Sequence, residues 1–233
     1  MCGQVMRYAV AHGLAERNPA ADIKISDVLK PANKTNYARL SEKELPELLH
    51  KVNEYDGQPL TLFALQLMVL TFVSTSELIG ARWDEFEVNK KEWRIPAQRM
   101  KMRTPHIVPL SSQAIAVLEG IQKLDADDIL LFPSQRRNGK SMSNNTILYA
   151  FYRMGYHSRM TGHGFRGLAS TILHEQGYKH DHIELQLAHT QRDAVSAAYN
   201  HSLYLEPRAR MMQNWANYLD ELAAGAKIMN LRD

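Results

Sequence analysis

The stretch GHGFRGLAST, residues 162–171, places His163 and Arg166 three positions apart in a run that is otherwise small and apolar. The apolar spacing that follows predicts a helix over residues 165–176. Arg166 would lie in the first turn of that helix and His163 just ahead of it, where backbone amides favour an anion. An arginine fork also binds two phosphate oxygens at once. The stretch therefore indicates a phosphate site, and the alternative is a glycine turn with polar surface caps.

Composition and charge place the chain among ordinary soluble globular proteins. Its 233 residues are 45% hydrophobic and 23% charged, with a formal net charge of +3, which is typical of globular domains. The charge is uneven, because residues 91–166 hold 12 lysines or arginines against five acidic residues. Such a basic region favours a polyanion as partner. The alternative is a solvated basic face without a partner.

Cysteine use and hydropathy indicate a cytoplasmic protein. The single cysteine, Cys2, excludes an internal disulfide framework and fits a reducing compartment. The chain has no apolar run of about 18 residues, the length that a transmembrane helix needs. Its first 22 residues have no hydrophobic segment of the signal-peptide type. We therefore expect no contact with a membrane.

Breaks in periodicity divide the chain into segments. Residues 1–16 have helical periodicity and lead to an Asn-Pro dipeptide, where the chain stops or turns. The residues up to about 39 have no sustained period and indicate a linker. Ser41 and Glu44 then have the spacing of a capping box, which predicts that the main domain begins at about residue 40.

Within the main domain the pattern predicts mostly helices. Residues 60–72 are apolar on nearly all sides, which is typical of a buried helix. Residues 93–96 and 106–110 flank a basic turn and predict a β-hairpin. Further helices are predicted over residues 112–123, 144–154, 165–176, 181–188 and 205–222. We therefore expect a mainly α fold with a small antiparallel β-sheet, in the α+β class.

The histidines invite a metal hypothesis, because seven of the ten lie between residues 157 and 201. Their spacing argues against it. His174-Glu175 is followed by Tyr178, so the HExxH zinc pattern fails, and His180 and His182 have no third ligand at a recognisable spacing. The chain also has no glycine-rich loop of the Walker type. We expect neither a metal nor a cofactor, and a metal-dependent nuclease stays as a weaker alternative that insensitivity to chelators would exclude.

Cations and imidazoles without a metal suit the stabilisation of a phosphoryl-transfer transition state. Such a site needs a nucleophile, and the stretch LAHTQRDAVSAAYN, residues 187–200, contains His189 and Tyr199. A phenol has a pKa near 10, so it attacks well only where cations and hydrogen-bond donors favour the phenolate. Taken singly, Tyr199 is one of ten tyrosines, and most tyrosines serve packing or lie on the surface.

These residues carry a family resemblance. GHGFRGLAST resembles the H-x-x-R box of the tyrosine recombinases, and LAHTQRDAVSAAYN resembles the box that holds their second histidine and their nucleophile. The stretches ARLSEKEL, TSELIGARWDEF, MKMRTPHIVPLS and YLEPRARMMQNWANYLD resemble integrases of temperate phages and genomic islands. The resemblance runs from about residue 38 to residue 220.

The resemblance implies a domain organisation and a fold. Residues 1–21 resemble the last helix of the family's core-binding domain, most of which this sequence lacks. Residues 22–39 would be a linker, residues 40–222 the tyrosine recombinase catalytic domain, and residues 223–233 a C-terminal tail. The segment from about residue 205 onward is a candidate for contacts between protomers.

The resemblance also implies roles for single residues. Tyr199 would attack a DNA phosphate and form a 3′-phosphotyrosine link with release of a 5′ hydroxyl. Arg166 would bind the non-bridging oxygens, His163 would accept the tyrosine proton or bind the phosphate, and His189 would support the same phosphate. Lys101, in the hairpin turn, would protonate the leaving 5′ oxygen.

One position departs from the family pattern. Glu77 matches an acid that supports the site, but the family has an arginine three residues before it, where this chain has Ser74. A serine cannot replace a bidentate cation, and loss of such a group costs about two to three orders of magnitude in rate. Arg82 lies about two helical turns further on and is expected to pair locally or touch DNA. Tyr204 is the second candidate nucleophile, but its spacing from the histidine does not match the family.

We therefore expect a site-specific recombinase for integration and excision of a prophage or genomic island, impaired as written by Ser74. The alternative is a catalytically inactive DNA-binding or regulatory module. The expected partners are double-stranded DNA attachment sites, a homo-tetramer in the full-length protein, and accessory DNA-bending and excision-directionality proteins. The expected location is the nucleoid within the cytoplasm. The basic side chains expected to contact DNA are Arg99, Arg103, Arg136, Arg137 and Lys140.

Overall fold

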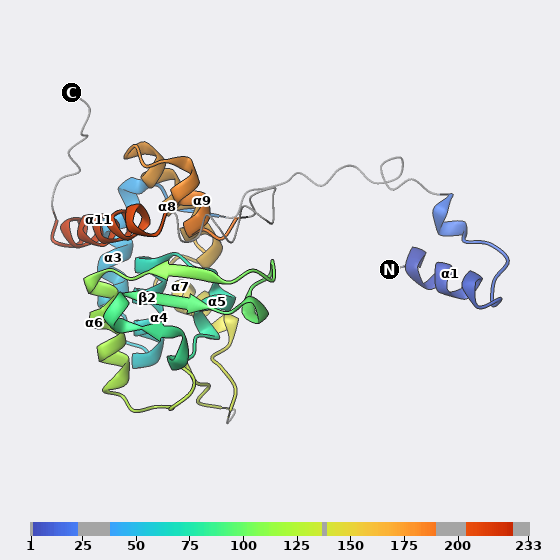
Figure 1. Ribbon diagram of the computed structural model, residues 1–233, viewed down its shortest axis with the longest axis horizontal. Coiled ribbons are helices and arrows are strands. Elements are labelled where there is room, and N and C mark those ends of the chain that lie inside the picture. Colours follow the sequence, from blue (N-terminus) through green and yellow to red (C-terminus); the bar gives the residue numbers. More distant parts are fainter. Residues whose placement is uncertain (1, 23–37, 137–138, 190–203, 226–233) are drawn as a thin grey trace. The chain divides into compact units, whose positions relative to one another are not determined.

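The computed structural model describes residues 2–22, 38–136, 139–189 and 204–225. The chain forms two compact units, residues 1–36 and 37–233 (Figure 1). The first unit contains helix α1 (Cys2–Ala11) and the 3-10 turn η1 (Pro19–Ala21). The helix is shorter than the predicted 1–16, because Gly13 adopts the left-handed conformation (φ 67°) that ends helices.

The second unit is built mainly from helices. Its 3-10 turn η2 (Glu42–Glu44) opens with the predicted capping box, in which the Glu44 carboxylate accepts from the Ser41 amide at 2.9 Å. The helices that follow are α3 (Leu45–Asn53), α4 (Pro59–Thr71), α5 (Thr75–Ile79), α6 (Ser112–Gln122), α7 (Asn144–Arg153), α8 (Gly162–Glu175), α9 (His180–Gln186) and α11 (Leu205–Ala223).

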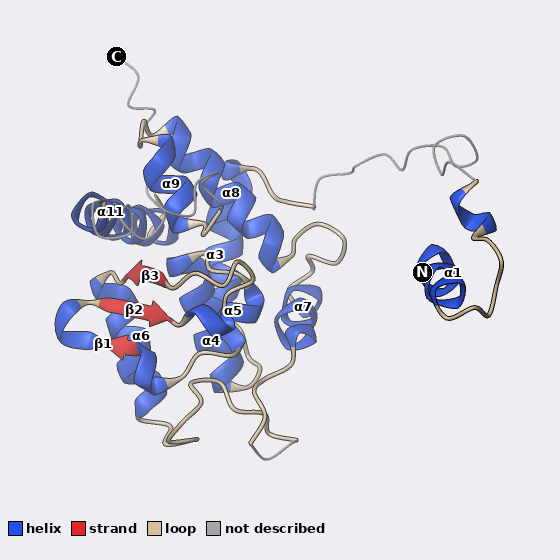
Figure 2. Cartoon of the chain, turned by 45° about the vertical axis from the view of Figure 1, so that its right-hand side comes forward, coloured by secondary structure: helices blue, strands red, loops and turns tan. Residues whose placement is uncertain are grey.

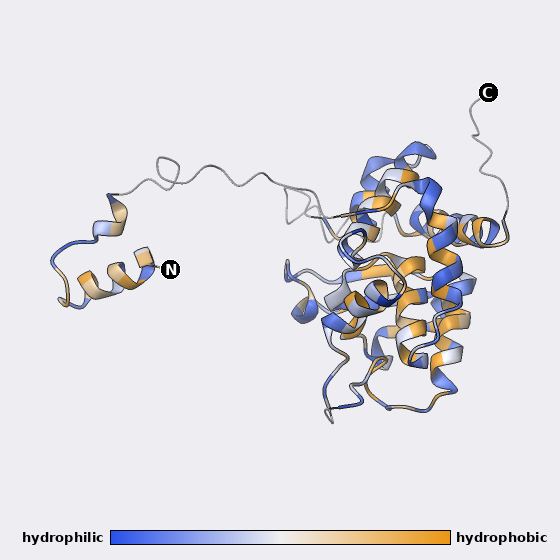
Figure 3. Ribbon diagram, turned by 180° about the vertical axis from the view of Figure 1, so that it is seen from behind, coloured by the Kyte–Doolittle hydropathy of each residue, from blue (hydrophilic) through white to orange (hydrophobic). Residues whose placement is uncertain are grey.

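Helix α4 is the centre of this unit. It is apolar on nearly all sides, as predicted, and it contacts α3, α5, α6, α7 and α11. The rings of Phe72 and Phe165 pack edge-on against the buried Trp215 of α11, and the Trp215 indole donates to the Val69 carbonyl at 3.0 Å. Orange, hydrophobic positions face inward on these helices in Figure 3. Because so many surfaces meet on α4, the two ends of this helix are fixed relative to the rest of the unit.

The small sheet has three antiparallel strands in the order β1 (Phe86–Glu87), β2 (Glu92–Ile95) and β3 (His106–Pro109). The predicted hairpin is confirmed, with Trp93 paired with Val108 and both side chains fully buried. β1 was not predicted, because two residues are too few to form an alternating pattern. Figure 2 shows the sheet beside α4 and α6, with α11 next to β3.

The predicted helices are confirmed within a few residues, with one error that bears on function. α8 begins at Gly162 rather than at residue 165, because the Thr161 hydroxyl accepts from the Gly164 amide at 2.9 Å and caps the helix. His163 therefore lies within the first turn of α8 and not ahead of it. The fold class is confirmed as mainly α with a small antiparallel sheet. None of the described helices is both long and apolar enough to cross a membrane.

Candidate active site

Two glycines allow the start of α8 to approach its neighbours closely. A Cβ atom on Gly162 would lie 2.5 Å from the Thr75 hydroxyl, and one on Gly164 would lie 2.2 Å from the Ala38 carbonyl oxygen. Both distances are shorter than a van der Waals contact, so neither position accepts a side chain without movement of the neighbours. The glycines therefore place the first turn of α8 directly against the start of α5 and against the chain segment at residue 38.

Substitution of Gly164 by alanine tests this close contact. We expect Gly164→Ala to lower the free energy of unfolding by about 1–3 kcal/mol, since the backbone at Ala38 must move. Thermal unfolding of the purified chain measures the effect. Gly167→Ala is the matched control, because its Cβ would meet only the flexible end of Arg39 at 3.3 Å. An equal loss of stability in both variants would contradict the role of the Ala38 contact.

Arg166 is the best fixed group of the candidate site. Its side chain is 8% exposed, and it donates to the Phe72 carbonyl at 2.8 Å and to the Leu187 carbonyl at 2.5 Å. Each of these two nitrogens has a second N–H, and Nε adds another. Burial lowers the pKa of Arg166 from its ordinary value, while Glu77 and Glu184 oppose that shift. The arrangement holds a permanent cation in one orientation, with donors left for an anionic ligand.

A strained backbone position lies at or next to each of the two carbonyls that bind Arg166. Phe72, at the end of α4, has φ 38°, and Ala188, just after Leu187, has φ 51°. Left-handed conformations are unfavourable for residues other than glycine and persist only where the surrounding structure imposes them. The fold therefore bends two segments around one guanidinium.

His163 lies close to Arg166 and to His189, the second histidine of the candidate site. His189 shares a 2.9 Å hydrogen bond between its Nδ1 and the Glu184 carboxylate. Because a carboxylate only accepts, this contact places a proton on Nδ1. Partial burial of the His163 ring lowers its pKa, and the nearby Arg166 and His189 lower it further. His163 is therefore mostly neutral at pH 7 and able to accept a proton.

Ser74 and Glu77 form a capping box at the start of α5. The Ser74 hydroxyl accepts from the Glu77 amide at 3.3 Å, and the Glu77 carboxylate accepts from the Ser74 amide at 2.8 Å. Glu77 is buried, and its charge favours the cationic form of Arg166. The Ser74 side chain thus serves the helix end and supplies no cation there. Arg82 pairs locally with Asp84 at 3.3 Å, one of the two roles expected for it.

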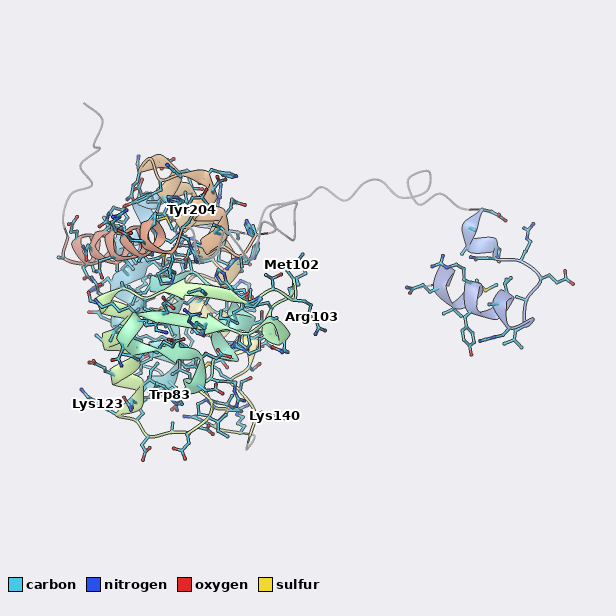
Figure 4. The ribbon with its side chains drawn as sticks, viewed as in Figure 1. Trp83, Met102, Arg103, Lys123, Lys140 and Tyr204 are labelled. Carbon is cyan, nitrogen blue, oxygen red and sulfur yellow. The ribbon has the colours of Figure 1, made fainter. Side chains whose placement is uncertain are left out.

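Lys101 and Arg103 lie in the turn that joins the two hairpin strands. Both side chains are exposed, and Figure 4 shows Arg103 and Met102 at the tip of this turn. Arg136 and Lys140 are exposed in a loop before α7, and Arg137 lies outside the described residues. Contact of these side chains with DNA stays a prediction.

Arg99 has partners within the fold. Its guanidinium forms an ion pair with the Glu85 carboxylate at 2.7 Å and donates to the Glu77 carbonyl, and the side chain is only 18% exposed. Arg99 thus links α5, the short helix that carries Glu77, to the turn before β1, which carries Glu85. Its contact with DNA stays a prediction.

In the sequence, both candidate nucleophiles fall between α9 and α11. Tyr199 lies outside the described residues. Tyr204 directly precedes α11, and its ring centre lies 5.1 Å from that of His182. Among the described residues, no group of three or more His, Cys, Asp or Glu side chains is placed to hold a metal ion.

Sequence reasoning missed the residues that orient the site. Glu184 was not singled out, although its carboxylate binds His189, because a single glutamate five residues before a histidine is no recognised motif. The carbonyls of Phe72 and Leu187 have no sequence signal, since every residue carries a carbonyl. Glu184 would have become a candidate only if the end of α9 had been predicted to the residue.

A mainly helical unit with a small sheet, and a buried arginine close to a histidine, agree with the catalytic domain of a tyrosine recombinase. The chain belongs to the phage integrase family, whose sequence model matches residues 38–206. It is 42% identical over 232 residues to the integrase of Enterobacteria phage P4, with 93% of this chain and 52% of that protein covered. It is 36% identical over 226 residues to the prophage integrase IntA of Escherichia coli, with 97% of this chain and 54% of that protein covered.

The chain therefore spans about half the length of these relatives. Among solved structures, it resembles the integrase from mycobacterium phage Brujita with a TM-score of 0.63 and 14% identity, over 97% of this chain and 74% of that one. It also resembles a lambda integrase dimer bound to a COC′ core site, with a TM-score of 0.57 and 18% identity, over 86% of this chain and 56% of that one. These likenesses confirm the fold.

Proposed function

We propose that the protein catalyses site-specific DNA recombination, in which Tyr199 breaks and rejoins DNA strands through a 3′-phosphotyrosine link. The observation that carries the proposal is the fixed guanidinium of Arg166, with His163 close both to it and to His189. A buried cation with free donors and a neutral imidazole beside it suits the developing charge of a phosphoryl-transfer transition state. Membership of the phage integrase family supports the same reaction.

The proposed reaction is the transfer of a DNA phosphate from a 5′ oxygen to the phenol oxygen of Tyr199. The phenol oxygen of Tyr199 attacks phosphorus, its proton passes to His163, and the bond between phosphorus and the 5′ oxygen breaks. The leaving 5′ oxygen takes a proton from Lys101. Arg166 binds the non-bridging oxygens, and His189, oriented by Glu184, donates to the same phosphate. Attack of a 5′ hydroxyl from another strand on the phosphotyrosine reverses the step, so the reaction needs no nucleotide.

The lowered pKa of His163 supports a role as proton acceptor. Burial, Arg166 and His189 all favour the neutral ring, and a neutral imidazole accepts a proton from an attacking phenol. The adjacent Arg166 cation then favours departure of that proton once bond formation is complete. His163 as proton acceptor is therefore the role that we adopt, in preference to hydrogen bonding alone.

The proposed partners are double-stranded DNA attachment sites of a prophage or genomic island. A lambda integrase dimer on a COC′ core site and a lambda integrase tetramer on a Holliday junction share this fold, and we propose DNA binding and a tetramer for the full-length protein. We further propose that residues 1–21 are the last helix of a core-binding domain and residues 22–39 a linker. Accessory DNA-bending and directionality proteins, and a place on the nucleoid, complete the proposal.

A second candidate function is a DNA-binding module without catalysis. The observation in its favour is Ser74, whose hydroxyl caps α5 where the family pattern has an arginine. This module would bind attachment-site DNA and leave every strand intact.

Trapping of a covalent adduct distinguishes the candidates. We expect a nicked duplex with an attachment site of a related integrase to yield a protein–DNA species that survives denaturation. Peptide mapping should place the DNA on Tyr199, and EDTA should leave the yield unchanged. The assay uses the Ser74→Arg variant beside the chain as written. DNA cleavage that leaves no adduct and that EDTA abolishes would support a metal-dependent nuclease, and DNA binding without cleavage or adduct in either chain would support the inactive module.

A further inference from the structure

Arg208, in the first turn of α11, is a buried cation that the proposed mechanism does not use. Its side chain is fully buried, and burial lowers its pKa to about 10. It donates from Nη2 to the Ile107 carbonyl at 2.6 Å and to the Gln186 side-chain oxygen at 2.7 Å. Among the described residues no carboxylate pairs with it, and its Nε and Nη1 have no hydrogen-bond partner.

A buried guanidinium of this kind costs stability. Removal of a charge from water is unfavourable unless a counter-ion and full hydrogen bonding offset the loss, and each buried donor without a partner adds its own penalty. Arg208 has two neutral acceptors and two nitrogens without a partner. Packing alone would be served better by an apolar side chain of similar size, so the fold retains Arg208 at the expense of stability.

The contacts of Arg208 lead to the groups that hold Arg166. Gln186, also fully buried, accepts from Arg208 and donates from its amide to the Thr71 carbonyl at 3.2 Å. Thr71 and Gln186 are each followed by the residue whose carbonyl binds Arg166, namely Phe72 and Leu187. A series of hydrogen bonds from Arg208 through Gln186 to Thr71 therefore fixes the backbone immediately before both of these carbonyls.

We propose that Arg208 is a positioning residue that, through Gln186, fixes the two carbonyls on which the orientation of Arg166 depends. The second hydrogen bond of Arg208, to the Ile107 carbonyl of β3, connects this series of hydrogen bonds to the hairpin whose turn carries Lys101. The expected effect of Arg208 on the rate of catalysis rests on the proposed function, whereas its effect on the orientation of the Arg166 guanidinium does not. A displacement of about 1 Å in a catalytic group costs about 100-fold in rate.

Substitution with methionine separates positioning from stability. In the Ser74→Arg chain, we expect Arg208→Met to slow adduct formation by about 10- to 100-fold. The unfolding temperature of this variant should change by less than about 4 °C. Loss of the two hydrogen bonds lowers stability, but removal of the buried charge raises it. Arg210→Met is the matched control, since Arg210 lies on the same helix, is exposed, and pairs only with Glu206 at 2.8 Å; it should leave both values unchanged.

Three further measurements test whether Arg208 acts through Gln186 on Arg166. Gln186→Met should slow the reaction to a similar extent, and the double variant should be no slower than either single variant. Arg208→Lys, which keeps the charge and one donor group, should recover part of the rate. Nitrogen NMR of the Arg166 guanidinium should show its signals shifted or broadened in Arg208→Met but not in Arg210→Met.

The outcomes distinguish this inference from the proposed function. If no chain with Tyr199 forms an adduct, the proposed function fails, and the NMR signals of Arg166 still test the positioning. Unchanged Arg166 signals and an unchanged adduct rate in Arg208→Met would overturn the inference. So would a loss of rate that only matches the fraction of unfolded protein. If Arg208→Met does not fold, Gln186→Met and Arg208→Lys give the same comparison.

Discussion

Replacement of Tyr199 by phenylalanine is expected to abolish the covalent protein–DNA adduct completely. The substitution removes only the phenol oxygen, so the cationic groups that would bind DNA are unchanged. Affinity for an attachment-site duplex should therefore stay within about twofold, since phosphate contacts dominate affinity. Denaturing gel electrophoresis of a nicked substrate measures the adduct, and a filter or gel-shift titration at fixed salt measures the affinity.

Tyr204→Phe is the matched control for this experiment. Tyr204 lies just before α11 with its ring against His182, and loss of its hydroxyl should leave adduct formation within a fewfold of the parent. An adduct that persists in Tyr199→Phe and disappears in Tyr204→Phe would transfer the nucleophile to Tyr204. An adduct that persists in both would overturn phenol attack altogether.

Restoration of a cation at residue 74 has the second largest expected effect. We expect Ser74→Arg to accelerate adduct formation by about 100- to 1000-fold, because a positioned cation at a developing phosphate charge contributes that much to rate. The start of α5 lies against the start of α8, as the contact between Thr75 and Gly162 shows. A long side chain at residue 74 thus begins close to the helix that carries His163 and Arg166.

The structure also predicts what this substitution costs. The arginine loses the hydroxyl that accepts from the Glu77 amide, and loss of such a cap lowers stability by about 1 kcal/mol. The reverse bond, from the backbone amide of residue 74 to the Glu77 carboxylate at 2.8 Å, does not depend on the side chain. Glu77 should therefore keep its place, and the gain in rate should come with a small drop in the unfolding temperature.

Ser74→Ala separates the cation from the cap. Alanine loses the same hydroxyl and adds no charge, so we expect the same drop in unfolding temperature and no acceleration. Single-turnover rates at saturating enzyme compare the three chains. Equal rates in the arginine and alanine variants would show that residue 74 is not the second cation position, and the alignment of TSEL with the family would then be wrong.

Local patterns predicted most of the secondary structure, because they express local physics. The apolar run at 60–72 predicted the buried helix α4, and the alternation around the basic turn predicted β2 and β3. The error at α8 has a specific cause. Gly162 and Gly164 have low helix propensity, but Thr161 caps them into the helix and the close neighbours Thr75 and Ala38 require glycine there. Tertiary packing thus overrode propensity.

The sequence by itself determined the family, the fold class and the candidate chemical groups, because these depend on residue types at set spacings. Only the tertiary structure decided how Arg166 is held, since its partners are backbone carbonyls from two segments distant in the chain. It also revealed Glu184 behind His189, the structural pairing of Arg99, and the unpaired charge of Arg208. Backbone carbonyls leave no trace in residue identity, and burial of a charge depends on which elements close around it. Those two physical facts explain why the orientation of the site could not be predicted from the residues alone.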